Sequence, residues 1–559
     1  MTAAATSLAG AQLSRPAPTG EQAPSTPLDH WLAAQGDLRA VARFTQRHES
    51  GTVPAHARYY RDLIPLTAPG PGQQYGFEVD LDACTGCKAC VTACHQLNGL
   101  EDEESWRSVG LLHGGSGGPA VQQHVTTACH HCVEPACLQG CPVEAYVKDP
   151  TTGIVRHLDD QCIGCGYCTW TCPYEVPTMS ARLGIVRKCD LCTDRLAAGE
   201  APACVQGCPN GAIRVGLVDV AAARVAAATP LVPGAPASTT TVPTTTYRSA
   251  TGIDPGLVAA DASAVVPGHA HPSLAVMLVL TQLSVGAFLV DLTVRLLAAG
   301  GAAEALPSNA VGALVAGLMA LGASVLHLGR PHLAFRAVLG VRRSWLSREI
   351  VAFVAFAGAA AAHAGATVGG VPLASATGAA VAGAVVVMGV TGVACSVMIY
   401  AATGRRWWRV GATGPRFALT TVSCGAATVL ASSLAAGADG APALVAPLTT
   451  TVVASVIAKL LLDASVVRHR HGSGELRGTA VLLTRDLRST SVRRLAAGTL
   501  GGVVLPVAVL VTARSPVPND GLVVALAVAA LALLVAGELL ERNLHFTAST
   551  PRRMPGAPT

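Results

Sequence analysis

The chain has 559 residues, of which 51% are hydrophobic and only 13% are charged. A chain of this length exceeds one ordinary hydrophobic core, so two or more domains are expected. The mean hydropathy of +0.45 indicates that part of the chain lies in lipid. The net charge of +5 is small for this length and gives no support for nucleic-acid binding.

The N-terminal part of the chain is expected to add little to a core. Residues 1–26 are rich in Ala, Pro, Ser and Thr, are predicted to be disordered, and lack the apolar stretch of a secretory signal. Residues 27–75 are predicted to form a helical extension that packs on its own domain, because apolar side chains recur there at helical spacing. These side chains are Leu28, Trp31, Leu32, Leu38, Val41 and Phe44. A strand is predicted at Phe77–Leu81.

Sixteen of the 18 cysteines fall in four quartets. The quartets are Cys84, Cys87, Cys90 and Cys94; Cys129, Cys132, Cys137 and Cys141; Cys162, Cys165, Cys168 and Cys172; and Cys189, Cys192, Cys204 and Cys208. Three of the four end in Cys-Pro, whereas His95 follows the last cysteine of the first quartet. A disulfide framework or zinc sites are the alternatives. Disulfide frameworks rarely repeat a two-residue loop so often, and zinc has no use for a string of sites.

The spacing within the quartets is typical of [4Fe–4S] ligands. Two quartets fit C-x₂-C-x₂-C-x₃-C and the other two are stretched variants of it. Three cysteines in a short loop hold three corners of a cube, and a distant cysteine followed by proline supplies the fourth. The sixteen thiolates therefore predict four clusters in a domain at 76–225 that conducts single electrons. Cys395 and Cys424 lie in apolar stretches and are interpreted as small core residues.

The composition changes twice after the cysteine region. Residues 226–270 are rich in Pro and Thr and are predicted to form an extended linker. Residues 271–545 are predicted to form a membrane anchor of eight helices, followed by a tail at 546–559. The apolar stretches lie near 273–297, 306–327, 349–368, 374–401, 416–436, 441–463, 494–513 and 520–541. Each has the roughly 20 residues that cross a hydrocarbon core, which disfavours the alternative of a soluble helix bundle.

The order and spacing of the quartets resemble the four-cluster electron-transfer subunit of dimethyl sulfoxide reductase-type molybdoenzymes. The resemblance is strongest at "CPYEVPTMSARLGIVRKCDLC". The apolar half resembles the anchor subunit of the same family, at "SVLHLGRPHLAFRAVLGVRRSWLSREI" and "SVMIYAATGRRWW". The resemblance implies a fusion of two subunits: an α+β ferredoxin-like cluster domain of two tandem double-cluster modules, joined to an all-α membrane bundle of eight transmembrane helices.

The resemblance also implies which cysteines share a cluster. The implied sets are Cys84, Cys87 and Cys90 with Cys208; Cys189, Cys192 and Cys204 with Cys94; Cys129, Cys132 and Cys137 with Cys172; and Cys162, Cys165 and Cys168 with Cys141. Some members of the family lack one cysteine of the third quartet and hold a three-iron cluster. The corresponding position here is Cys165, so four cubes are expected.

A membrane anchor attached to an electron carrier suggests an exchangeable quinone or quinol, either menaquinone or ubiquinone. His327, Arg330 and Glu349 lie at the ends of the second and third apolar stretches, on the same membrane face, and are candidate quinone ligands. By the resemblance, His327 and Glu349 fall on positions associated with quinol binding. The alternative is that Arg330 and Glu349 cap helices or meet lipid headgroups while His327 reaches the interface. No haem is expected, because His363 has no evident deep partner.

The resemblance implies an electron-transfer and anchor subunit that works with a separate molybdopterin-containing catalytic subunit and the quinone pool. The alternative function is a membrane redox sensor, or a quinone–ferredoxin link without a molybdopterin partner. The chain is expected in the cytoplasmic membrane with the cluster domain on the cytoplasmic face. Nineteen arginines lie in the loops after spans two, four and six and in the tail, against Arg295 and Arg514 on the other side.

Overall fold

The computed structural model describes residues 26–28, 30, 55–115, 121–297, 307–437, 441–472, 474–550 and 552–556. It divides into two compact units, Met1–Arg61 and Asp62–Thr559. In the first unit a 3₁₀ helix spans Ala55–Tyr59. The disorder predicted for residues 1–26 and most of the helical extension predicted for 27–75 lie outside the described residues.

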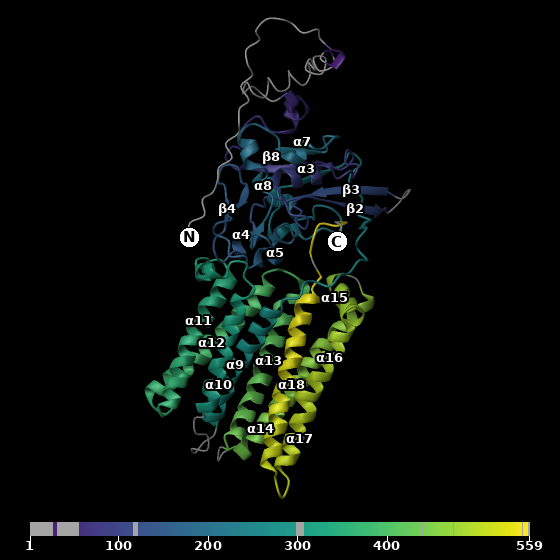
Figure 1. Ribbon diagram of the computed structural model, residues 1–559. Coiled ribbons are helices and arrows are strands. Elements are labelled where there is room, and N and C mark those ends of the chain that lie inside the picture. Colours follow the sequence, from purple (N-terminus) through teal and green to yellow (C-terminus); the bar gives the residue numbers. More distant parts are fainter. Residues whose placement is uncertain are drawn as a thin grey trace. The chain divides into compact units, whose positions relative to one another are not determined.

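Two three-stranded sheets frame the cluster domain of the second unit (Figure 1). In the first sheet, β1 (Gln73–Asp80) pairs antiparallel with β8 (Ile213–Asp219), so the two ends of the cysteine region lie side by side. In the second, β2 (Ser108–Gly114) pairs with β3 (Val121–Thr127). Two small antiparallel pairs complete the strands: β4 (Tyr146–Lys148) with β5 (Val155–His157), and β6 (Thr178–Ser180) with β7 (Ile185–Arg187).

The segment 226–270, predicted to be an extended linker, belongs to this framework instead. Its strand β9 (Thr246–Arg248) runs parallel to β1, and β10 (Leu257–Ala259) pairs antiparallel with β2. Backbone pairing with strands far away in the sequence needs no local apolar pattern, which is why composition did not predict it. Val232 is also buried, at 2% exposure, so the segment contributes to the core.

Each cysteine quartet contains a short helix that carries its third cysteine. These helices are α3 (Ala89–Asn98), α4 (Ala136–Gly140), α5 (Tyr167–Thr171) and α7 (Ala203–Gln206). Helix α6 (Thr193–Ala197) lies between α5 and α7, and helix α8 (Val220–Ala226) follows β8. In the quartets that contain α4, α5 and α7, a proline follows the fourth cysteine, and each helix ends before that cysteine. In the first quartet His95 replaces the proline, and α3 extends past the fourth cysteine to Asn98, a total of ten residues.

Among the described residues, the second half of the chain contains eight helices long and apolar enough to span a membrane, as predicted; Figure 1 shows them as a bundle. The first six are α9 (Pro272–Leu297), α10 (Pro307–Val325), α11 (Trp345–Val368), α12 (Ala376–Ala401), α13 (Val410–Ala435) and α14 (Ala441–Ala464). The last is α18 (Asp520–Thr547). At the crossing of α9 and α13, a Cβ on Gly286 would lie 1.9 Å from the Thr421 carbonyl, so only glycine permits this approach.

The seventh span is not a regular helix. It consists of α16 (Arg488–Thr499), one π turn (Leu500–Val504) and α17 (Leu505–Ala513). Pro506 has no amide hydrogen and its ring would collide with the carbonyl four residues earlier in an α-helix, so the wider turn before it relieves that collision. Short helical segments connect the spans at the cluster-facing end: η4 (Pro331–Val338), η5 (Arg406–Trp408), η6 (Ser465–His471) and α15 (Glu475–Thr484).

The C-terminal segment returns to the cluster domain. The Met554 side chain is 2% exposed and packs in the core beside Val79 and Leu112. The Gly556 amide donates a hydrogen bond to the Asp261 carboxylate at 2.7 Å. The end of the last span is therefore held against the same domain that precedes the first span.

Candidate functional site

The sixteen quartet cysteines form four groups, each made of three cysteines from one quartet and the fourth cysteine of another. Two of the groups each surround a small cavity: Cys84, Cys87, Cys90 and Cys208 line one, and Cys129, Cys132, Cys137 and Cys172 line another. The four groups are Cys84, Cys87, Cys90 and Cys208; Cys94, Cys189, Cys192 and Cys204; Cys129, Cys132, Cys137 and Cys172; and Cys141, Cys162, Cys165 and Cys168.

Hydrogen-bond donors point at the sulfur atoms of these groups. The amide of Ala145 lies 3.2 Å from the Cys141 sulfur, and the amide of Ala212 lies 3.3 Å from the Cys208 sulfur. A third amide, that of Leu191, lies 3.5 Å from the Cys189 sulfur. Such donors stabilise a thiolate rather than a thiol and tune the potential of a bound cluster.

Two buried cations lie among the thiol groups without a carboxylate partner in the described part of the chain. Arg107 is 2% exposed; burial opposes its charge, but Cys204 and Cys90 outweigh burial and raise its pKa. Lys188 is 3% exposed, and its amino group lies 3.7 Å from the Cys129 sulfur and 2.8 Å from the Cys189 carbonyl. Buried cations need anionic partners, and the thiolates are the groups available to them.

The donor set therefore fits [4Fe–4S] clusters. Each group offers four sulfur ligands, amide donors reach sulfurs in three of the groups, and the fixed cations offset negative charge. A bound [4Fe–4S] cluster supplies one-electron transfer. The chain's own contribution is to hold the thiolates, shield them from water and place positive charge beside them.

A cavity of about 210 Å³ lies between the cluster domain and the membrane helices. The cluster domain contributes Ile163, Cys165, Tyr167 and Trp170 to its lining. The membrane half contributes residues of α9, α10, η4, α11 and α12, among them His327, Glu349 and Tyr400. Most of the lining is apolar, so the few polar groups stand out as places where a polar ligand atom can be held.

Glu349 and His327 both line this cavity, and each keeps a polar atom that can form a further hydrogen bond. Glu349 is 2% exposed, accepts a hydrogen bond from the Ser396 hydroxyl, and has no ion-pair partner among the described residues. Nδ1 of His327 is buried and has no hydrogen-bond partner in the described structure. Burial lowers the pKa of His327, so its imidazole is neutral at pH 7 and can accept or donate a hydrogen bond.

Arg330, the third predicted quinone residue, does not line the cavity. Its guanidinium donates to the Asp159 carbonyl at 2.7 Å, and its amide donates to the Ile163 carbonyl at 3.0 Å. Both acceptors belong to the cluster domain. Arg330 therefore attaches the loop after α10 to that domain.

Further contacts fix the cluster domain against the bundle. The Tyr167 hydroxyl donates to the Ile399 carbonyl at 2.8 Å, and Arg405 forms an ion pair with Glu175 at 3.2 Å. The backbones of Gly184 and Gly329 approach so closely that a Cβ on Gly329 would lie 2.2 Å from the Gly184 carbonyl. These contacts give the cavity a fixed wall from each side.

Several of these groups were not identified from the sequence. Arg107 and Lys188 were missed because a buried cation has no local signature; the only signal is that Lys188 directly precedes Cys189. Tyr167 and Ser396 were missed because their roles depend on contacts with residues more than 40 positions away.

Two family models match the chain. A 4Fe-4S dicluster domain matches residues 121–218, and the DMSO reductase anchor subunit matches residues 266–547, about half of the chain. One polypeptide of the anaerobic dimethyl sulfoxide reductase of Escherichia coli is 40% identical over 154 residues, which cover 26% of this chain and 75% of that protein.

The cluster region is also similar to formate dehydrogenase subunits. The nitrate-inducible formate dehydrogenase iron-sulfur subunit of Escherichia coli is 34% identical over 185 residues, 29% of this chain and 63% of that protein. The formate dehydrogenase iron-sulfur subunit of Haemophilus influenzae is 36% identical over 155 residues, 25% of this chain and 50% of that protein. The matches thus span between half and two thirds of these two relatives. The chain belongs to the DMSO reductase anchor subunit family and carries, on the same polypeptide, an iron–sulfur domain of the kind found in the separate subunits of these enzymes.

Proposed function

We propose that this chain transfers electrons between a membrane quinone and a separate molybdopterin-containing catalytic subunit. The observation that carries the proposal is the shared cavity, which is lined by a cysteine of the cluster domain and by two polar residues at the ends of membrane helices. The family membership and the similarity to iron–sulfur subunits of DMSO reductase and formate dehydrogenase support the same function.

The four thiol groups each hold one [4Fe–4S] cluster in this proposal. The group of Cys141, Cys162, Cys165 and Cys168 is the one beside the membrane cavity. The group of Cys84, Cys87, Cys90 and Cys208 contains the only exposed cysteine, Cys87, among all eighteen. Electron exchange with a partner protein needs a cluster close to the surface, so this second group is the contact point for the catalytic subunit.

His327 and Glu349 bind the quinone oxygens and exchange protons with them. Oxidation of a quinol releases two electrons and two protons; the carboxylate of Glu349 accepts the proton of one quinol hydroxyl, and neutral His327 accepts a hydrogen bond and then the proton from the other hydroxyl. A cluster held by Cys141, Cys162, Cys165 and Cys168 would take up the two electrons one at a time. Quinone reduction follows the same steps in reverse.

The cluster domain and its catalytic partner lie on the cytoplasmic face in this proposal. The loops after α10, α12 and α14 contact or face the cluster domain and carry most of the arginines that lie outside the spans in the membrane half of the chain. Basic residues in short loops remain cytoplasmic during insertion.

The proposal is tested by purifying the tagged chain anaerobically from its native membrane. A molybdopterin-containing protein should co-purify, iron should amount to about sixteen atoms per chain, and a quinol analogue should reduce the clusters. Iron content of about four atoms with zinc present would contradict the cluster assignment. Full iron content without quinol-dependent reduction would contradict the quinone assignment alone.

A further inference from the structure

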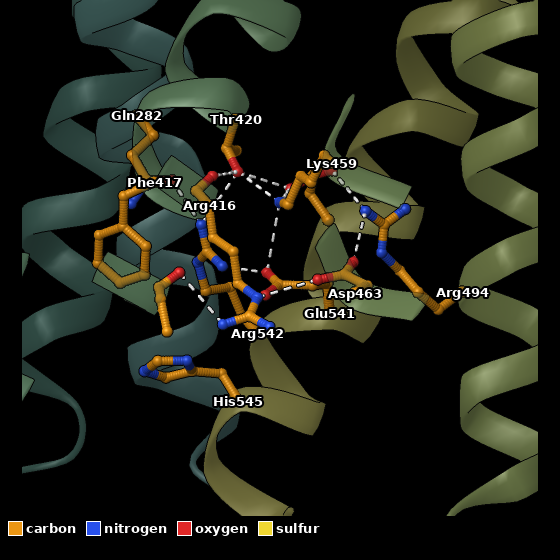
Figure 2. A network of polar contacts seen from close by, with 12 residues as sticks. Gln282, Arg416, Phe417, Thr420, Lys459, Asp463, Arg494, Glu541, Arg542 and His545 are labelled. Carbon is orange, nitrogen blue, oxygen red and sulfur yellow. Dashed lines mark hydrogen bonds and ion pairs between the residues drawn. The ribbon is translucent and has the colours of Figure 1, made fainter. Parts of the chain in front are cut away.

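Seven charged side chains from four helices meet inside the membrane bundle, away from the cavity described above (Figure 2). The cations are Arg416, Lys459, Arg494 and Arg542, and the anions are Asp463, Glu538 and Glu541. All are buried except Asp463, whose side chain is 20% exposed. Charges at this depth are costly unless they are paired.

Each carboxylate is paired with two cations or more, although Oδ2 of Asp463 accepts no hydrogen bond in the described structure. Glu538 accepts from Lys459 and from Arg494, the latter at 3.2 Å. Asp463 lies 3.0 Å from Arg416 and 3.5 Å from Arg494. Four cations thus face three carboxylates in the described part of the bundle, which leaves one positive charge in excess.

Arg494 and Arg542 both keep unused donors, and of these two arginines Arg494 is the one that lines a cavity. Its Nη2 contacts the carboxylates, but its Nε and Nη1 are buried and have no hydrogen-bond partner among the described residues. The side chain is only 2% exposed, so bulk water does not satisfy these donors. Unsatisfied buried donors on a cation favour the approach of an anion.

Arg494 lines a cavity of about 560 Å³ at the cluster-facing end of the bundle. Arg470 of η6 and Arg488 at the start of α16 also line it, both exposed and without an ion-pair partner in the described residues. Asp463 and Glu541 are the acidic lining residues, and each is already paired with two cations. The free charge facing the cavity is therefore positive.

Most of the remaining wall of this cavity is apolar, apart from Thr484 and Ser491, and part of it is exposed. Val467, Val492 and Leu495 line it and are 42%, 54% and 45% exposed. They belong to helices long and apolar enough to span the membrane. An anion with attached hydrocarbon chains matches such a site, because its charge meets the arginines while its chains lie against the exposed valine and leucine side chains.

We propose that this cavity binds one anionic phospholipid, whose phosphate is held by Arg470, Arg488 and Arg494. The two cavities share no lining residue, so the proposal is independent of the quinone assignment. Lipid headgroup phosphate and free phosphate have the same chemistry, and the apolar wall selects the lipid.

The test compares the whole purified chain, delipidated in neutral detergent, with the double variant R470Q/R488Q. Phosphatidylglycerol and phosphatidylcholine with identical acyl chains are titrated, and bound lipid is counted by native mass spectrometry. Wild-type protein should retain one phosphatidylglycerol per chain and bind it at least tenfold more tightly than phosphatidylcholine. The double variant should lose about 30-fold in phosphatidylglycerol affinity, since each interfacial arginine contributes about fivefold.

The matched control is Arg493→Gln, which removes an exposed arginine of the same helix that does not line the cavity. Its affinity should stay within twofold of wild type, and Arg488→Lys should keep most of the affinity. An equal loss in Arg493→Gln, or equal affinity for the two lipids, overturns the proposal. Inorganic phosphate that occupies the site at millimolar concentration without competition from phosphatidylglycerol overturns the lipid assignment.

Discussion

Cys165 and Glu349 line the same cavity, one from the cluster domain and one from the first turns of α11. A proposed cluster ligand and a buried carboxylate without an ion-pair partner among the described residues thus face a common apolar space. This arrangement places an electron acceptor and a proton acceptor at one site, which is what oxidation of a quinol requires.

Glu349→Gln should slow quinol-dependent cluster reduction by about 100-fold, because an amide cannot take up the proton while it keeps the hydrogen bond from Ser396. His327→Ala should slow the same reaction. Stopped-flow absorbance of the clusters with a quinol analogue measures the rate, and iron content should be unchanged. Arg343→Gln changes an exposed arginine that does not line the cavity; it is the control and should retain the wild-type rate. A normal rate in Glu349→Gln would show that the proton acceptor lies elsewhere.

Cys141→Ser should alter the cluster proposed for Cys162, Cys165 and Cys168, because Cys141 lies with them although it belongs to another quartet. Electron paramagnetic resonance of the reduced protein should show one changed signal and a loss of quinol-dependent reduction. Cys137→Ser, four residues earlier, should change a different signal. If both variants change the same signal, the crossed ligation is refuted.

Lys188→Met should lower the midpoint potential of the neighbouring clusters by on the order of 100 mV, because removal of a buried positive charge disfavours the more negative reduced form. Redox titration followed by electron paramagnetic resonance measures the shift. Lys88→Met is the matched control: Lys88 lies in a cysteine loop but is exposed, so water screens its charge. Equal shifts in the two variants would contradict the role of burial.

Stability should fall as the pH falls from 6.5 toward 4, and His271 should be responsible for part of this loss. Burial, followed by the charges of His327 and His269, lowers the pKa of His271 to about 4 from its ordinary 6.5. Between these two values the unfolded chain binds a proton that the folded chain excludes, so acid favours unfolding. Thermal unfolding over a pH series should be flatter in His271→Gln, and unchanged in the control His332→Gln, which alters an exposed ring that is not among the groups acting on His271.

The eight spans and the four cysteine quartets were predictable because both follow local rules. A span is a run of apolar residues, and a cluster loop has a fixed spacing of cysteines. His327 and Glu349 could be selected as candidates because polar residues at helix ends are rare in an apolar sequence, and their role at a quinone stays a prediction.

What the sequence could not predict depends on contacts between distant residues. The strands β9 and β10 find their partners in β1 and β2, more than 140 residues earlier, and their Pro/Thr-rich surroundings predict only an extended chain. The pairing of Lys459 with Glu538 likewise joins two helices 79 residues apart. In both cases the sequence around one residue gives no indication of which distant residue it contacts.

A reporter fused after Thr559 should be active only in the cytoplasm. Of the nineteen arginines counted on the cluster side, seven form ion pairs with carboxylates, which leaves twelve; the seven are Arg405, Arg416, Arg485, Arg494, Arg542, Arg552 and Arg553. On the other side Arg295 forms an ion pair with Asp291 at 2.7 Å, so Arg514 is the arginine that remains to be counted there. The bias therefore survives removal of the paired residues and still directs the cluster side inward.

Paired fusions of alkaline phosphatase and green fluorescent protein at Thr559 and in the loop after α9 distinguish the two orientations. Phosphatase activity at Thr559 with fluorescence only from the loop after α9 would reverse the topology and place the catalytic partner outside the cytoplasm.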